Sequence, residues 1–115
     1  MKVIIAGSRT ITFPPYLYDA IKESGLDITE IVCGMARGVD MLGYQWATKH
    51  GLKIREFPAD WNRLGRAAGR ARNWEMARYA EALIAVWDGR SGGTKHMIET
   101  ARKQGLKVFV KEVRL

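Results

Sequence analysis

Five short, mostly apolar runs recur along the chain, each rich in β-branched residues and separated from the next by a longer, more polar stretch. Because these runs are largely apolar and do not strictly alternate with polar residues, they are typical of strands covered on both faces. The predicted strands are Lys2–Ala6, Glu30–Cys33, Lys53–Phe57, Ala82–Trp87 and Lys107–Glu112.

Four stretches between the strands have helical signatures. Pro14 and Pro15 mark the start of the first, which runs to about Ser24 and stops at Gly25. The others run from Val39 to His50, from about Ala68 to Tyr79, and from Gly93 or Thr94 to near Gln104. Strands that alternate with such helices predict βαβ units with right-handed crossovers. We therefore expect an α/β fold, a Rossmann-like three-layer α/β sandwich with a five-stranded parallel sheet.

One connection is longer than the rest. Pro58 to Ala67 lies between the third strand and the third helix and contains Asp60, Trp61 and Arg66. Loops of this length in compact domains are often functional.

Composition limits the class of protein. A length of 115 residues, 47% of them hydrophobic and 27% charged, predicts one globular domain over residues 1–115. A single cysteine, Cys33, excludes an intramolecular disulfide and favours a reducing compartment. The longest apolar run, Ala82–Trp87, is too short to span a bilayer, and the amino-terminal apolar run is too short for a secretory signal. We expect a cytoplasmic protein that does not bind membranes.

The charge balance points to an anionic partner. Lys and Arg number 19 and Asp and Glu 12, for a net charge of +7. Arginines cluster in one segment whose only acid is Glu75; they are Arg63, Arg66, Arg70, Arg72 and Arg78. The guanidinium fork suits phosphate and carboxylate groups. A nucleotide or a nucleic acid is one interpretation, and a solvated basic helix face is the other.

Glycine-containing turns follow three of the predicted strands. They contain Gly7, Ser8 and Arg9 after the first strand, Gly34, Arg37, Gly38 and Asp40 after the second, and Asp88, Gly92, Gly93 and Thr94 after the fourth. Ligands of open parallel sheets bind outside the carboxyl ends of the strands, where helix N-termini attract phosphate. One such turn is explained by structure alone, but three at one edge favour a binding site. Asp60 and Asp88 suit a sugar hydroxyl or magnesium ion, or equally a helix cap or turn.

The sequence lacks the motifs of several common kinds of binding and catalytic site. The sequence has no P-loop, no dinucleotide-binding glycine fingerprint and no nucleophile elbow. His50 and His96 share no metal-ligand spacing, so we expect neither a metal nor a cofactor. Trp61 and Trp74 could stack on a base or pack as ordinary aromatic residues.

The order of the motifs resembles a known family. The motifs are Gly7-Ser8-Arg9, Cys33 to Asp40, Gly65 to Gly69 with Arg72, Asn73 and Met76, and Gly92 to Ile98. Over nearly the whole chain they resemble the YspA/YpsA-related SLOG family of bacteria and phages. Its superfamily unites Lonely-guy phosphoribohydrolases, DNA-processing proteins of the DprA type and sensors of nucleotide signals. The resemblance implies a Rossmann-like fold, nucleotides bound at the glycine turns, and a homo-oligomer such as a dimer.

The resemblance to Lonely-guy enzymes is incomplete. Arg72 and Met76 match their Arg-Lys-x-x-Met stretch, and Gly93-Thr94 matches their later Gly-Thr pair. Their glutamate three residues after the threonine is Met97 here, and the next acid is Glu99. Two residues are about 200° around a helix, so Glu99 is expected to point away from that glutamate's position.

Three functions follow as hypotheses. The first is binding of a nucleotide or nucleotide-derived ligand, a mononucleotide or an ADP-ribose-like molecule. Its expected ligand-binding residues are Gly7, Ser8, Arg9, Gly34, Arg37, Gly38, Asp40, Arg66, Arg72, Asn73, Asp88, Gly92, Gly93 and Thr94. The second is N-glycosidic hydrolysis of a nucleoside monophosphate with Arg72 and Glu99 as catalytic candidates. The third is single-stranded DNA binding through the arginine-rich segment with Trp61 and Trp74.

Overall fold

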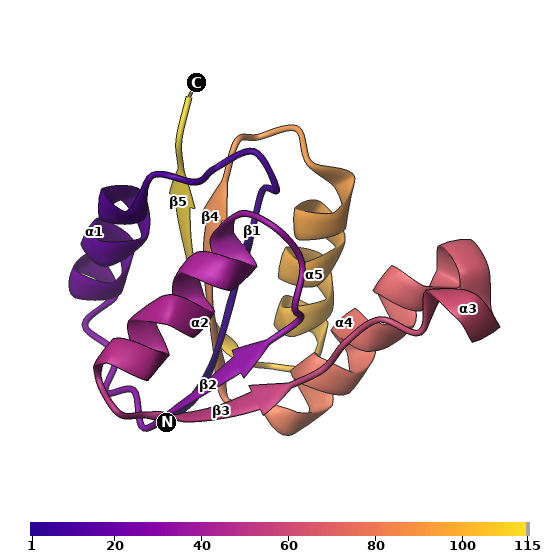
Figure 1. The fold of residues 1–115 in the computed structure, drawn as a ribbon, viewed down its shortest axis with the longest axis horizontal. Coiled ribbons are helices and arrows are strands. Elements are labelled where there is room, and N and C mark those ends of the chain that lie inside the picture. The colour runs from indigo at the N-terminus through magenta and orange to yellow at the C-terminus, as the bar shows by residue number, and fades with distance from the viewer. Residues whose placement is uncertain (115) are drawn as a thin grey trace.

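The computed structural model describes residues 1–114 and contains one five-stranded sheet. Its strands are β1 (Lys2–Gly7), β2 (Glu30–Cys33), β3 (Lys53–Glu56), β4 (Ala82–Trp87) and β5 (Lys107–Glu112). Its helices are α1 (Pro14–Ser24), α2 (Val39–Lys49), α3 (Trp61–Leu64), the 3₁₀ turn η1 (Gly65–Ala67), α4 (Ala68–Tyr79) and α5 (Gly92–Lys103). Figure 1 shows the sheet between two layers of helices.

All strand pairs are parallel, in the order β3-β2-β1-β4-β5. The predicted α/β Rossmann-like fold with a five-stranded parallel sheet is therefore confirmed. The chain runs outward from β1 to β3 and then returns to β4 on the other side of β1. This reversal puts the switch point between β1 and β4, where sheets of this kind hold their ligands.

Successive side chains of β1 point to opposite faces of the sheet, so this strand contributes to the hydrophobic core on each face. Val3 and Ile5 face α1 and α2, whereas Ile4 and Ala6 face α4 and α5. These four side chains are buried. Burial on both faces explains why the central strands are apolar throughout.

The structure corrects two expectations. The predicted loop Pro58 to Ala67 contains α3 and η1, because the Asp60 side chain caps a short helical turn through the backbone N–H of Arg63 at 3.2 Å. The edge strand β3 is mostly exposed and not covered on both faces. Otherwise the predicted strand and helix ends coincide with the observed ones or differ from them by one or two residues.

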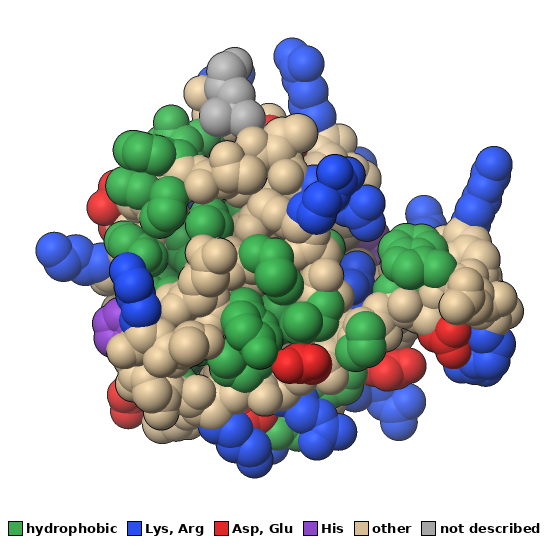
Figure 2. All heavy atoms as spheres, in the orientation of Figure 1, with side chains coloured by type: hydrophobic (Ala, Val, Ile, Leu, Met, Phe, Trp, Pro, Cys, Tyr) green, Lys and Arg blue, Asp and Glu red, His purple; other side chains and the backbone are tan. Residues whose placement is uncertain are grey.

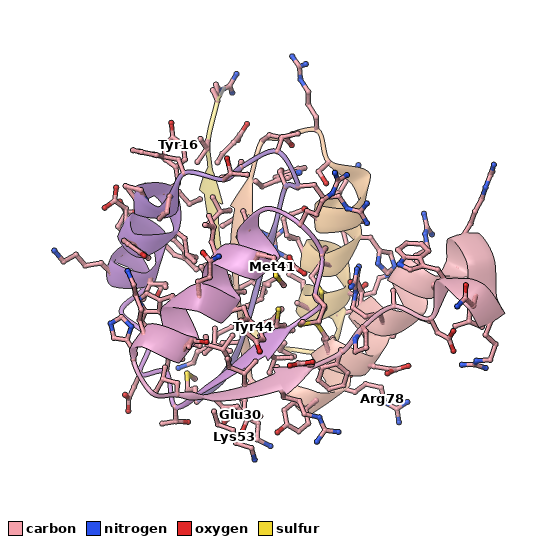
Figure 3. The ribbon with its side chains drawn as sticks, viewed as in Figure 1. Tyr16, Glu30, Met41, Tyr44, Lys53 and Arg78 are labelled. Atoms are coloured by element: carbon pink, nitrogen blue, oxygen red, sulfur yellow. The ribbon has the colours of Figure 1, made fainter. Side chains whose placement is uncertain are left out.

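Side-chain contacts close the amino-terminal edge of the sheet. Glu30 of β2 is buried, and Lys53 of the adjacent β3 lies beside it, with Nζ 3.6 Å from Glu30 Oε1 (Figure 3). The Tyr79 hydroxyl donates a hydrogen bond to the other Glu30 oxygen. The two carboxylate oxygens of Glu30 are therefore paired with Lys53 and Tyr79.

Residues 1–114 contain neither a cluster of metal-binding side chains nor a helix suited to span a membrane. No three His, Cys, Asp or Glu side chains gather there as a metal site would need. None of the helices in this part of the chain is long and apolar enough to cross a membrane.

Candidate functional site

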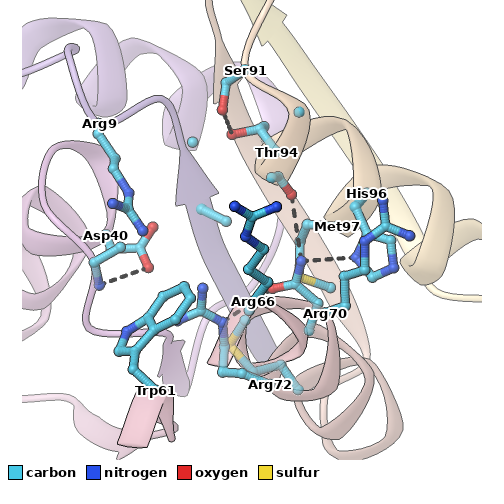
Figure 4. A pocket seen from close by; sticks show the side chains of 18 residues that line it. Arg9, Asp40, Trp61, Arg66, Arg70, Arg72, Ser91, Thr94, His96 and Met97 are labelled. Atoms are coloured by element: carbon cyan, nitrogen blue, oxygen red, sulfur yellow. Dashed lines mark hydrogen bonds between the residues drawn. The ribbon is translucent and has the colours of Figure 1, made fainter. Parts of the chain in front are cut away.

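A cavity of about 260 Å³ opens at the carboxyl end of β1, beside α4 and α5 (Figure 4). It therefore lies at the switch point of the sheet. Its lining residues are Ala6, Gly7, Arg9, Ala36, Asp40, Trp61, Arg66, Gly69, Arg70, Arg72, Asn73, Met76, Ser91, Gly92, Gly93, Thr94, His96 and Met97.

Four of the lining side chains are arginines, and they come from three different segments. Arg9 follows β1, Arg66 lies in η1, and Arg70 and Arg72 lie on α4. Asp40 is the single carboxylate among the described lining residues. The cavity therefore has an excess of positive charge that suits an anion.

Arg72 is the most firmly held of these arginines. One terminal nitrogen donates a hydrogen bond to the Gly34 carbonyl, and Nε donates to Asn73 Oδ1 at 3.1 Å. Partial burial lowers the pKa of Arg72, and the nearby Asp40 carboxylate opposes that shift. An arginine remains charged despite such a shift, so Arg72 presents a fixed cation to the cavity.

Asp40 lies in the first turn of α2 and is only 5% exposed. Its Oδ2 accepts a hydrogen bond from the Ala36 N–H at 3.2 Å. Burial raises the pKa of Asp40 to about 6, although the Ala36 N–H and the Arg72 charge favour the ionised form. Asp40 thus places a carboxylate from the α2 start near the charges of Arg72 and Arg9.

The amino terminus of α5 forms another side of the cavity. Gly92, Gly93 and Thr94 make its first turn, where backbone N–H groups have no acceptor within the helix. The Thr94 hydroxyl donates to Ser91 Oγ at 3.2 Å. These N–H groups and the helix dipole favour a bound phosphate or carboxylate.

Asn73 connects the two helices that flank the cavity. Its side-chain nitrogen is 3.4 Å from the Gly93 carbonyl and 3.0 Å from His96 Nδ1. Burial, followed by the charge of Arg70, lowers the pKa of His96. These contacts fix the start of α5 against α4, so the free N–H groups and the arginines keep a defined geometry.

The structure brings many of the expected ligand-binding residues to the cavity. Those that line it are Gly7, Arg9, Asp40, Arg66, Arg72, Asn73, Gly92, Gly93 and Thr94. Those that do not are Ser8, Gly34, Arg37, Gly38 and Asp88, and the catalytic candidate Glu99 also lies outside the cavity lining. Glu99 is exposed on α5, and Met97 lines the cavity instead.

Ser8 and Asp88 have structural roles. Ser8 is 1% exposed, and its hydroxyl oxygen accepts the Asp88 N–H at 3.0 Å. The Asp88 carboxylate accepts the N–H groups of Arg90 and Ser91, both at 2.8 Å. These bonds, that from Ser91 first, lower the pKa of Asp88. The turn that leads into α5 is therefore built by these two residues, outside the cavity.

Sequence reasoning left several lining residues outside the expected binding set. They include Trp61, Gly69, Arg70, Ser91, His96 and Met97. A signal existed on α4, because Gly69, Asn73 and Met76 follow one another at helical spacing and share one face. Choosing that face as the ligand side requires knowing how α4 packs against α5.

The fold and its site thus define a Rossmann-like α/β domain with an arginine-lined cavity at the switch point. The model of the YspA, cpYpsA-related SLOG family matches residues 1–64. The chain is 34% identical over 120 residues to the Gene 61 protein of Mycobacterium phage D29, covering 94% of each chain. The chain belongs to the YspA, cpYpsA-related SLOG family.

A solved structure shares this fold. DNA processing protein A (DprA) from Streptococcus pneumoniae superimposes with a TM-score of 0.75 at 23% identity. The match covers 95% of this chain and 49% of the DprA chain. The chain therefore corresponds to about half of DprA in length, and the likeness establishes the shared fold.

Proposed function

We propose that the chain binds a phosphate-bearing nucleotide in the cavity beside α4 and α5. The observation that carries the proposal is the convergence of four arginines and the amino terminus of α5 on one cavity. Charged guanidinium groups and free backbone N–H groups are two common means by which proteins hold phosphate. The membership of the SLOG family supports the same ligand class.

The cavity size bears on the kind of nucleotide. Its volume of about 260 Å³ is slightly below the usual range of small-molecule sites, roughly 300–1,000 Å³. This size favours a mononucleotide over an ADP-ribose-like molecule.

Calorimetric titration of nucleoside monophosphates tests the proposal with a matched pair of variants. Arg9 and Arg37 are both exposed arginines in turns at the same sheet edge, but only Arg9 lines the cavity. We expect Arg9→Ala to weaken binding by about 10- to 100-fold, the value of a charged hydrogen bond. Arg37→Ala removes the same charge and is expected to change affinity far less. Equal effects of the two substitutions would show that net charge alone attracts the nucleotide.

Hydrolysis of the nucleotide has weaker support. Glu99 is exposed and outside the cavity, and the single lining carboxylate, Asp40, is held by the Ala36 N–H. An oxocarbenium-like transition state needs a carboxylate beside the sugar. Assays for free base released from each monophosphate check this alternative, which predicts turnover that Arg72→Ala abolishes.

Single-stranded DNA is the second candidate ligand. Trp61 is 52% exposed, and the Arg63 side chain on the same short helix is 71% exposed. Figure 2 shows basic and hydrophobic side chains together on this projecting segment. Aromatic and basic groups side by side suit unpaired nucleic acid. Fluorescence anisotropy with an oligonucleotide tests it, because backbone binding weakens steeply as salt rises.

A further inference from the structure

Trp61 combines exposure with a place in the cavity wall. The exposed large hydrophobic residues within 1–114 are Phe13, Tyr18, Trp61 and Trp74. Among these four, only Trp61 lines the cavity. An aromatic side chain that is half exposed beside a set of arginines has unused stacking surface next to an anion site.

The segment around Trp61 holds the indole in place. Asp60 Oδ1 accepts the Arg63 N–H at 3.2 Å, and Oδ2 accepts Arg63 Nε at 3.0 Å, which fixes the turn of α3. The indole edge lies over the start of α4, where a Cβ on Gly69 would be 3.6 Å from Trp61 Cη2. The edge of the ring therefore packs on α4 while half of the residue remains open to solvent.

The α5 start and the Trp61 indole lie at different ends of the cavity. In Figure 4, Ser91 and Thr94 of the α5 start lie at one end, Trp61 lies at the other, and Arg66 lies between them. A nucleotide has a matching arrangement, since its phosphate and its base lie at opposite ends of the sugar. The α5 terminus and the arginines match the phosphate, and the indole matches the flat face of the base.

We propose that Trp61 is the stacking platform for the base of the bound nucleotide. This inference rests on the proposed function and narrows it: the ligand is a nucleoside phosphate, and the base contributes to affinity. Sugar phosphates and inorganic phosphate occupy only the positively charged, phosphate-binding end of the cavity and bind more weakly. Since every base has a π-face, stacking on one indole gives affinity with little choice among bases.

Calorimetric titrations with AMP, GMP, CMP, UMP and ribose 5-phosphate test the proposal. In the unaltered protein, we expect the monophosphates to bind at least tenfold more tightly than ribose 5-phosphate. In Trp61→Ala, we expect their affinities to fall by about tenfold or more, the contribution of one stacked base. Binding of ribose 5-phosphate is expected to stay within about twofold, because that probe has no base to stack. Trp61→Phe is expected to restore most of the lost affinity.

Trp74→Ala is the matched control. Trp74 is 39% exposed on α4 and does not line the cavity, so its removal is expected to leave all five affinities unchanged. Thermal unfolding of each variant shows whether it remains folded. Quenching of indole fluorescence by AMP, measured in the unaltered protein and in Trp61→Phe, gives an independent readout that a merely structural Trp61 would not alter.

The outcomes separate the two proposals. If ribose 5-phosphate binds as tightly as AMP and Trp61→Ala changes neither, the stacking proposal is wrong and the phosphate site stands. If none of the five probes binds at millimolar concentration, the proposed function fails and the stacking proposal fails with it. If Trp61→Ala leaves AMP binding intact but turns a dimer into a monomer in sedimentation, Trp61 is an interface between copies and the stacking proposal is overturned.

Discussion

The glycines around the cavity form two contrasting groups. A Cβ on Gly7 would lie 2.0 Å from the Val86 carbonyl oxygen, and one on Gly38 would lie 2.4 Å from the Ser8 carbonyl oxygen. A Cβ on Gly92 or Gly93 would meet nothing within 4 Å. The first group lies where backbones are pressed together, whereas the second lies where the backbone is exposed.

This difference separates framework from binding surface. The turns after β1 and β2 dock against each other, since the Ser8 carbonyl accepts the N–H groups of Ile11 at 3.3 Å and Val39 at 3.4 Å. Glycine is needed there for close approach. At the start of α5 the protein has no such need, so glycine leaves room for a ligand to reach the helix N–H groups. Three glycine substitutions test this comparison, and a fourth substitution, Asp40→Asn, tests the buried carboxyl group beside the turns.

Gly7→Ala is expected to have the largest effect. Its Cβ would overlap the backbone of β4 and lie 2.7 Å from Val39 Cγ2, and neither the strand nor the α2 start can move cheaply. We expect a loss of about 3 kcal/mol or more in the free energy of unfolding, and a Tm lower by roughly 10 °C. Urea unfolding measures the loss. An unchanged midpoint would mean that the two turns are not tightly docked.

Asp40→Asn is expected to alter how stability depends on pH. Burial raises the pKa of Asp40 to about 6, so the folded protein binds this proton more tightly than the unfolded chain, whose aspartates titrate near 3.8. The stabilisation by protonated Asp40 is full below pH about 4 and is lost as pH rises through about 6.

The measurement is the difference in unfolding free energy between the unaltered protein and Asp40→Asn. From pH 7.5 to pH 4 this difference should shift by about 2 kcal/mol in favour of the unaltered protein. Asp19→Asn, which changes an exposed residue of α1, serves as the control and is expected to show no such shift. Parallel pH profiles for Asp40→Asn and the unaltered protein would contradict the assignment of the raised pKa to the burial of the Asp40 carboxyl group.

Gly34→Ala is expected to have an intermediate effect, because its new Cβ meets mainly side-chain atoms. That Cβ would lie 2.7 Å from an Arg72 terminal nitrogen and 2.9 Å from Asp40 Oδ2. The guanidinium can swing away but then loses its bond to the Gly34 carbonyl. We expect about 1 kcal/mol of stability to be lost and nucleotide affinity to fall about tenfold. Retained affinity in calorimetry would show that the position of Arg72 does not matter for binding.

The sequence predicted the fold of the molecule better than the residues that line its cavity. The apolar runs gave the strands, and parallel topology then placed the glycine turns of Gly7, Gly34 and Gly92 at one edge. It did not reveal that Ser8 and Asp88 bond to each other across β1 and β4, because that contact exists only after the strands pair. The 200° offset of Glu99 from the expected acid did follow from helix geometry, and Glu99 is indeed outside the cavity.

The segment around Trp61 shows a second limit. Asp60 is a common helix-capping residue, but a helix of four residues is too short to show a helical pattern of apolar positions, so Pro58 to Ala67 was predicted as a loop. The sequence likewise did not show that Arg70 and His96 line the cavity, since a helical residue reaches the cavity only if the helix turns that face inward. Sequence spacing defines the faces of α4 and α5, and packing between the two helices selects among them.

Gly93→Ala is expected to have the smallest effect on stability and the most informative effect on binding. Alanine is the better helix former, and its Cβ would enter open space, so the free energy of unfolding should rise by about 0.5 kcal/mol. If a phosphate sits against the α5 start, the same methyl group crowds it and lowers nucleotide affinity. The substitution therefore separates stability from binding, whereas Gly7→Ala damages the framework on which both depend. A variant that is both more stable and fully competent to bind AMP would place the phosphate away from the α5 start, leaving the arginines as its main contacts.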